Sequence, residues 1–175
     1  WFKSLLFLGA GAVMHATGRR DFDGLGGLIH RMPVTAAFWL VGAMSISALP
    51  PFNGFVSEWL LLQSFLFSPG LPHPWLTMVV PVAAALVVLV AALAGFAMVK
   101  FYGIIFLGQM REPALQDAHD AGPWEKAGLI WLALITLLLG VMPSTVILRI
   151  DAATRQLLGT GLADMAWGKG HLLDA

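Results

Sequence analysis

The sequence predicts an all-α fold, a polytopic bundle of membrane-spanning helices in which one helix is discontinuous. Hydrophobic residues make up 58% of the 175 residues and charged residues only 11%, whereas a soluble domain carries about 25% charged residues. The few charges are clustered, which leaves four long uncharged runs: 4–17, 32–57, 59–99 and 127–148. Such a chain is suited to the bilayer, because its runs are long and apolar enough to form membrane helices.

Three of the predicted spans are regular. Residues 76–107 and 126–148 each exceed the roughly 20 apolar residues that a helix needs to cross the hydrocarbon. Residues 1–16 are expected to be the second half of a span. The chain opens with Trp1 inside this apolar run, without the basic segment of a signal peptide, so we expect a fragment of a longer protein. Residues 149–175 are expected to form a C-terminal polar tail, or a loop to a missing span.

The span predicted over 33–68 is broken at 49–54. Pro50 and Pro51 lack backbone donors and, with Gly54 close behind, cannot continue a helix. One interpretation is two short spans that turn at the surface, and the other is a single helix interrupted within the membrane. The second is favoured because Glu58 follows the break by about one turn, and a helix break beside a buried carboxylate is the arrangement transporters use at ion sites.

The polar connectors predict the orientation. If the broken helix crosses once, connectors 17–31 and 108–125 share one side and hold most of the Arg residues, whereas 69–74 on the other side has no Arg or Lys. The positive-inside rule then places the charged side in the cytoplasm. Three tryptophans are expected near span ends, as in an aromatic belt: Trp39, Trp75 and Trp124.

Glu58 is the sharpest functional candidate among the ionisable residues. A charge deep in a membrane costs at least about 2.5–3.5 kcal/mol on insertion scales, and intramembrane acids are functional by default. The functional interpretation is a proton-carrying carboxylate in a hydrated pocket. The structural alternative is a surface Glu that follows a loop.

Three basic residues are further proton-relay candidates. Lys3 lies in an apolar run, where desolvation favours the neutral amine, although a Lys at a span end also snorkels to the interface. Lys100 lies near the cytoplasmic end of its predicted span, so the same two interpretations stand. His15 can shuttle protons at physiological pH, but a lone His near an interface is more often structural.

Several function classes are excluded or unsupported. The sequence has no Cys, which rules out thiolate-held metal and iron–sulfur sites within it. We find no His pair with metal-ligand spacing, no catalytic triad and no nucleotide-binding glycine motif. The net charge is zero, so nothing points to nucleic acid. We therefore expect no catalytic residue, cofactor or metal in this chain.

Several separated motifs, in order along the chain, resemble the antiporter-like family of proton-conducting membrane subunits. This family comprises subunits of respiratory complex I, multi-subunit sodium/proton (Mrp) antiporters and membrane-bound hydrogenases. The sequence resembles above all hydrogenase-4 component B and the corresponding formate hydrogenlyase subunit. The motifs are Phe2-Lys3-Ser4-Leu5-Leu6-Phe7-Leu8-Gly9-Ala10-Gly11, His15-Ala16-Thr17-Gly18, Leu25-Gly26-Gly27-Leu28 and Ala48-Leu49-Pro50-Pro51-Phe52-Asn53-Gly54-Phe55-Val56-Ser57-Glu58-Trp59.

The resemblance implies two inverted five-helix repeats, each with a broken helix, and places this chain in the second repeat at the C-terminal end of the protein. It implies that Lys3 is a central relay residue and Glu58 the terminal one. The antiporters usually carry Ser-Lys where this chain has Ser57-Glu58, so the Glu favours the hydrogenase branch.

The implied function is that of a non-redox, proton-translocating subunit in a hydrogenase-4/formate-hydrogenlyase-like or complex I-like oxidoreductase complex. The expected partners are sibling membrane subunits, a peripheral redox arm, the lipid bilayer and protons, in the plasma (inner) membrane of a prokaryote. The alternative is a multi-subunit cation/proton (Na⁺/H⁺) antiporter without redox partners. A scaffold with an inactive channel is a third interpretation.

Overall fold

The computed structural model describes residues 1–21, 24–66 and 74–158. The chain divides into two units, Trp1–Gly140 and Val141–Ala175, and each is described separately. The first unit contains the helices α1 (Phe2–Thr17), α2 (Pro33–Ile46), α3 (Asn53–Leu66), α4 (Pro74–Ile105) and α5 (Pro123–Val141), with short 3-10 helices η1 (Leu28–His30) and η2 (Pro113–Asp117). The second unit contains α6 (Pro143–Leu158).

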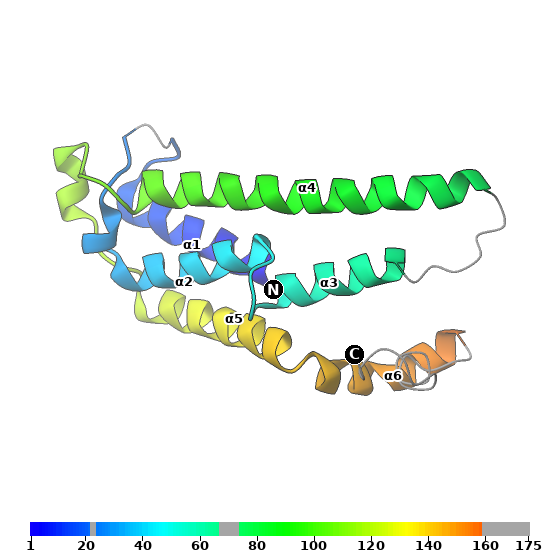
Figure 1. Cartoon of the computed structure of the whole chain (residues 1–175). Helices are drawn as coiled ribbons and strands as arrows, with labels where there is room; N and C mark the ends of the chain where they lie inside the picture. Colours follow the sequence, from blue (N-terminus) through cyan, green and yellow to red (C-terminus); the bar gives the residue numbers. More distant parts are fainter. Residues whose placement is uncertain (22–23, 67–73, 159–175) are drawn as a thin grey trace. The chain divides into compact units, whose positions relative to one another are not determined.

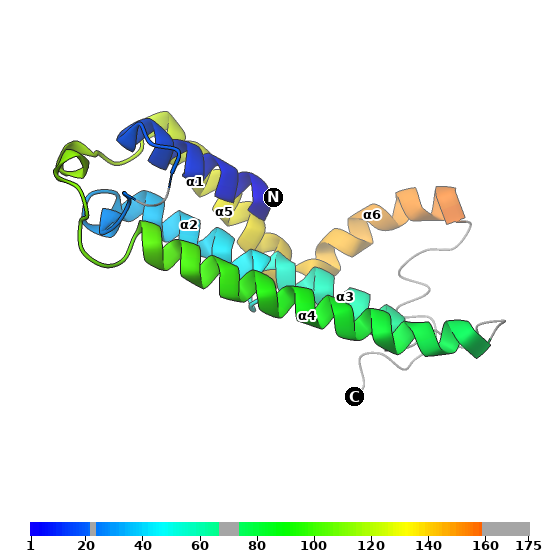
Figure 2. The same cartoon turned by 90° about the horizontal axis from the view of Figure 1, so that it is seen from above.

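The discontinuous helix is confirmed. Helices α2 and α3 have 14 residues each, so each is about 21 Å long, less than the hydrocarbon thickness of about 30 Å. They follow one another along one line beside the 32-residue α4 (Figures 1 and 2). Only together do they reach across a bilayer. The interpretation as two short spans that fold back at the surface therefore does not describe this structure.

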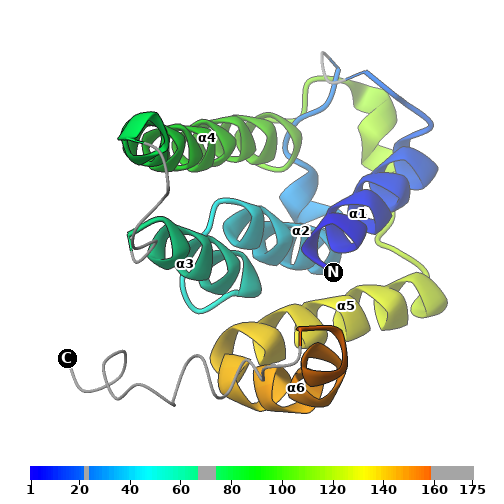
Figure 3. The ribbon, with the colours of Figure 1, turned by 90° about the vertical axis from the view of Figure 1, so that its right-hand side faces the viewer.

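Helix α1 packs on α2 through small residues. A Cβ on Gly9 would lie 2.7 Å from Cδ1 of Trp39, and a Cβ on Gly42 would lie 2.9 Å from Cγ of Leu6. The two backbones therefore approach closely, as helices in lipid do. The end view in Figure 3 shows α1 beside α2, with α5 along another side of the pair.

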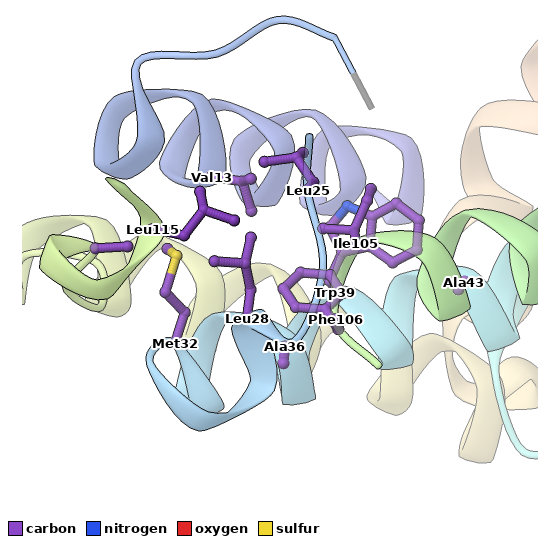
Figure 4. Packing of buried hydrophobic residues seen from close by; sticks show 11 residues of the cluster. Val13, Leu25, Leu28, Met32, Ala36, Trp39, Ala43, Ile105, Phe106 and Leu115 are labelled. Carbon is purple, nitrogen blue, oxygen red and sulfur yellow. The ribbon is translucent and has the colours of Figure 1, made fainter. Parts of the chain in front are cut away.

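A buried apolar cluster joins α1, α2, the end of α4 and both charged connectors (Figure 4). Trp39 lies at its centre, only 7% exposed, with its ring centroid 6.1 Å from that of Tyr102 and 5.8 Å from that of Phe106. The Trp39 side chain thus packs inside the unit and does not face the membrane interface, as an aromatic-belt residue would. The missing side chain of Gly9 leaves the space that this indole fills. Trp124, in contrast, is 89% exposed at the start of α5.

The two charged connectors lie at the same end of the first unit. The amide of Gly27 donates to the carbonyl of Leu107 at 3.1 Å, and that of Ile29 to Phe106 at 3.0 Å. Close by, the Arg19 guanidinium donates to the Glu112 carboxylate. The first connector is thus held against the segment that follows α4, at the end where α1 finishes and α2 begins.

The predicted span 126–148 is wrong at its C-terminal end. Helix α5 ends at Val141, and a new helix begins at Pro143. Proline has no amide hydrogen, clashes with the carbonyl four residues earlier and disfavours helical geometry in the residue before it. The predicted boundary at 148/149 therefore falls inside α6.

Two expected segments lie largely outside the described residues. The connector 69–74 is described only at Pro74, where α4 begins, and of the expected tail 149–175 the structure describes only the helical part up to residue 158. By length and composition, two described stretches are apolar enough to cross a membrane, Thr77–Ile105 and Pro123–Val141.

Candidate functional site

The break between α2 and α3 is a compact turn held by its own polar groups. The amide of Leu49 donates to the Met44 carbonyl at 3.1 Å, and that of Phe52 donates to Leu49 at 3.2 Å. The Ser45 hydroxyl donates to Oδ1 of Asn53 at 2.8 Å, which ties the last turn of α2 to the first residue of α3. Backbone groups that a broken helix would leave open are thereby partly satisfied, as a nonpolar environment requires.

Glycines allow this turn to pack tightly on both sides. A Cβ on Gly54 would lie 1.7 Å from the carbonyl oxygen of Ser45, so α3 begins in direct contact with the α2 backbone. On the other side, a Cβ on Gly140 of α5 would lie 2.0 Å from the carbonyl oxygen of Pro51. The main chain at Pro51 and Phe52 thus contacts α5, while Gly54 contacts α2; Pro50 and Pro51 are joined by a cis peptide bond.

Glu58 lies in the second turn of α3, four residues after the buried Gly54. Its side chain is half-buried, and among the described residues it has no hydrogen-bond or ion-pair partner. The neighbouring Ser57 hydroxyl is already used, since it donates to the Gly54 carbonyl at 2.8 Å. The structure therefore positions a carboxylate just past the break without a hydrogen-bond or ion-pair partner among the described residues.

Lys3 lies in the first turns of α1 and is exposed along an apolar groove. The groove has a volume of about 820 Å³ and runs between α1 and α4 over Trp39 of α2. Arg20 is part of the lining, as is Met14 near the end of α1. No described residue forms an ion pair with the Lys3 ammonium, whose charge faces mostly hydrocarbon side chains.

The other two candidates lie at the connector end of the unit. Lys100 is exposed near the C-terminal end of α4. His15 is in the last turn of α1, and its Nδ1 is 3.0 Å from Oε1 of Glu125 at the start of α5. The groove lined by Lys3 includes none of Glu58, Lys100 or His15. The four candidates are thus not gathered into one site by the described residues.

Asp120 is a structural centre that the sequence analysis missed. Its carboxylate accepts hydrogen bonds from the amides of Val34 and Thr35, each at 3.2 Å, from the Thr35 hydroxyl at 2.7 Å and from the amide of Ala121 at 2.9 Å. Lys126 lies 3.5 Å away. Asp120 therefore caps the N-terminus of α2 from 85 residues along the chain.

The hydrogen bonds to Asp120 favour its charged form, because they lower its pKa. Partial burial by itself raises the pKa of Asp120, but the bonds from Thr35, Ala121 and Val34 outweigh it and hold the pKa below the ordinary value. A signal for this cap was present in the sequence. Helix α2 begins Met32-Pro33-Val34 and has no side-chain cap of its own, so its free amides require a partner from elsewhere.

Thr136 of α5 is a second feature that the sequence did not flag. It is fully buried, and its hydroxyl has no hydrogen-bond partner among the described residues. It lies one turn before Gly140, the residue that packs on the break. Most buried hydroxyls in proteins are paired, so this polar group near the break is an exception.

The chain is similar to one protein family and to several known proteins. Residues 1–87 match the family described as "NADH:quinone oxidoreductase/Mrp antiporter, TM". Formate hydrogenlyase subunit 3 of Escherichia coli (strain K12) is 38% identical over 152 residues, which cover 87% of this chain and 25% of that protein. Hydrogenase-4 component B of the same organism is 36% identical over 143 residues, covering 82% of this chain and 21% of that protein.

A solved structure has the same fold. The chain superposes on a subunit of an archaeal respiratory membrane complex, the membrane-bound sulfane sulfur reductase, with a TM-score of 0.74 and 24% identity. The match covers 99% of this chain and 31% of that one. The chain thus spans about a quarter of the length of the two curated relatives. Residues 1–87, just under half of the chain, are thus similar to the transmembrane family of NADH:quinone oxidoreductase and Mrp antiporter subunits.

Proposed function

We propose that this chain is part of a proton-translocating membrane subunit of a redox complex of the hydrogenase-4/formate-hydrogenlyase-like or complex I-like type. The observation that carries the proposal is Glu58, a half-buried carboxylate without a described partner, one turn past the helix break. The similarity to formate hydrogenlyase subunit 3 supports the same function.

The physical argument starts from the cost of a charge in a membrane. A carboxylate near the middle of a bilayer costs at least about 2.5–3.5 kcal/mol, and Glu58 recovers none of this cost from an ion pair among the described residues. A group in this situation changes its protonation state readily when the local potential changes. Exchange of a proton with water at the break is therefore the chemistry that Glu58 is suited to perform.

Lys3 is proposed as the second relay residue. Its ammonium lies along the apolar groove and has no ion-pair partner among the described residues, so no structural contact competes with a relay role. His15, at the connector end of α1, is proposed to exchange protons with water on that side, whereas Lys100 is exposed near the connector end of α4 and is given no essential role. Redox chemistry elsewhere in the complex would supply the free energy.

The proposed partners are sibling membrane subunits and, through them, a peripheral redox arm. The relatives named above include a subunit of formate hydrogenlyase and a component of hydrogenase-4, which supports a multi-subunit assembly. The proposed location is the plasma membrane of a prokaryote, with connectors 17–31 and 108–125 in the cytoplasm. No catalytic or cofactor-binding role is proposed for the chain itself.

A second candidate function is cation/proton antiport without redox partners. The family description that matches residues 1–87 includes the Mrp antiporters. Transport that stops when Na⁺ is removed would favour this function over the redox-linked one.

The deciding experiment replaces Glu58 with Gln in the native membrane assembly and measures proton translocation in vesicles. We expect a loss on the order of a hundredfold, as when a positioned proton-transfer group is removed, with normal assembly of the complex. Glu58→Asp should retain part of the rate. Ser64→Ala, an exposed position on the same helix, is the matched control. A wild-type rate in Glu58→Gln would show that the relay role is wrong and would favour a scaffold.

A further inference from the structure

A small cavity lies at the connector end of the first unit, apart from the groove and the helix break. Its volume is about 260 Å³, and it lies between the last turn of α1, the residues before α5 and the first turn of α5. Four titratable side chains are among its lining residues: His15, His119, Asp120 and Glu125. The proposed relay uses His15 only, so the rest of the cavity has no assigned role.

The contact between His15 and Glu125 sets the chemistry of the cavity. Nδ1 of His15 is 3.0 Å from Oε1 of Glu125, while Oε2 accepts a hydrogen bond from the amide of Gly122 at 3.1 Å. A carboxylate facing Nδ1 keeps the hydrogen on that nitrogen. The lone pair of Nε2 is then free to take up a proton.

The same contact leaves the imidazole open to water. The His15 side chain is 75% exposed and that of Glu125 is 34% exposed. Imidazole is the side chain whose ordinary charge change falls within the physiological pH range. A solvent-open imidazole held by a carboxylate is therefore a suitable place to exchange protons with water or a buffer.

The titratable groups around His15 come from α5 and from the connector before it. Glu125 faces it from α5, and Asp120 and His119 face the cavity from the preceding connector. Asp120 is held by Lys126, 3.5 Å away, and by the amides at the start of α2. Glu125 is thus the carboxylate left to balance an imidazolium, with His119 as a second imidazole.

The cavity and the groove open at the same end of α1. The groove lined by Lys3 reaches Met14, the residue before His15. Lys3 itself is twelve positions earlier in the helix, about 18 Å away by helix rise. The groove and the cavity share no lining residue, so a proton released at His15 needs water to reach the groove.

We propose that the His15–Glu125 pair is a proton-collecting site on the connector face of this subunit. A hydronium ion or the acid form of a buffer gives its proton to Nε2 of His15, and Glu125 balances the imidazolium. The imidazolium then gives that proton to water on the way to the groove and returns to its neutral form. This inference rests on the proposed function, because it supplies the protons that the relay would move.

The experiment uses the native complex in vesicles and measures proton translocation at pH 8 in weak buffer, where protons are scarce. We expect His15→Gln and Glu125→Gln each to lower the rate about tenfold, less than the roughly hundredfold effect of a sole proton-transfer group. Added imidazole buffer should restore both variants, because it delivers protons in place of the lost site. Asp117→Asn, an exposed acid in the same connector, is the control and should keep the wild-type rate.

The outcomes separate this inference from the proposed function. Loss of rate in Glu58→Gln, together with a wild-type rate in His15→Gln, overturns the collecting site alone. A loss in His15→Gln or Glu125→Gln that imidazole does not restore shows a structural contact between α1 and α5, and also overturns it. Wild-type complex that moves no protons overturns both. Glu58→Gln should be insensitive to added imidazole, which tests the relay independently of proton supply.

Discussion

The ionisable side chains near the two ends of α2 differ in whether they have hydrogen-bond or ion-pair partners. At its N-terminal end, Asp120 accepts four hydrogen bonds and lies beside Lys126, and Arg19 is paired with Glu112. Beyond its C-terminal end, Glu58 follows the break with no described partner. The first arrangement fixes charges in one state, whereas the second leaves a charge free to change. The charges with a structural role thus lie at the N-terminal end of α2, and the candidate relay residue lies past its C-terminal end.

Backbone contacts and not ion pairs hold the break in place. Gly54 and Gly140 admit main-chain atoms where any side chain would collide. The turn therefore keeps its shape whether Glu58 is charged or neutral. This independence is useful for a relay, since the scaffold does not depend on the protonation state of the group it positions.

Among the substitutions that test the two ends of α2, Gly54→Ala is expected to have the largest effect on stability. A Cβ 1.7 Å from the Ser45 carbonyl oxygen cannot be accommodated without moving α3 away from α2. We expect a loss of stability of about 3 kcal/mol, the upper end of the usual range for overpacking, measured by thermal unfolding of the native complex in detergent. Gly103→Ala in α4, where the Cβ would meet nothing within 4 Å, is the control. Equal unfolding temperatures for the two variants would contradict the tight packing of the break.

A smaller effect is expected at the opposite end of α2. Asp120→Ala removes the cap from the amides of Val34 and Thr35, and loss of a cap costs about 0.5–2 kcal/mol. We expect a value near the top of that range, because the bonds are charge-assisted. The same unfolding assay with Asp117→Ala, an exposed acid in the same connector, should give a change within about 0.5 kcal/mol. If the two variants unfold alike, the cap contributes nothing.

The charge of Asp120 also predicts a pH dependence. Because its pKa is lowered in the folded state, the unfolded chain binds the proton more readily. The stabilisation is therefore complete above the ordinary Asp pKa of about 3.9 and is lost as the pH falls from there through the lowered folded-state pKa. The free energies of unfolding of the wild type and of Asp120→Asn should therefore differ most at pH 6 and least at pH 3. A constant difference across that range would mean that Asp120 does not act through its charge.

The smallest effect is expected for Lys100→Gln. The Lys100 side chain is exposed near the connector end of α4, where a long side chain extends its ammonium to the interface. We expect proton translocation to change by less than about twofold, within the range of ordinary surface substitutions. Lys3→Gln in the same assay is the comparison and should reduce the rate far more. A loss for Lys100→Gln as large as that for Lys3→Gln would make Lys100 an essential relay residue.

The sequence by itself determined the fold class and the position of the helix break. Long uncharged runs leave the bilayer as the only medium that fits, and Pro50, Pro51 and Gly54 cannot continue a helix. Pro143 was an equally strong signal for the end of α5, but the apolar run across it concealed the break. The nomination of Glu58 likewise followed from its spacing after the prolines, and its relay role stays a prediction.

Only the tertiary structure decided which groups meet. Asp120 caps a helix that begins 87 positions earlier in the chain at Pro33, Glu125 faces His15 across 110 positions, and Trp39 is buried because Gly9 lies opposite. Local periodicity contains no information about such pairs, since they depend on how helices pack side by side. The sequence therefore determined which segments become helices in lipid, because backbone groups there must be hydrogen-bonded within the chain. Packing decided which charged side chains have partners and which have none among the described residues.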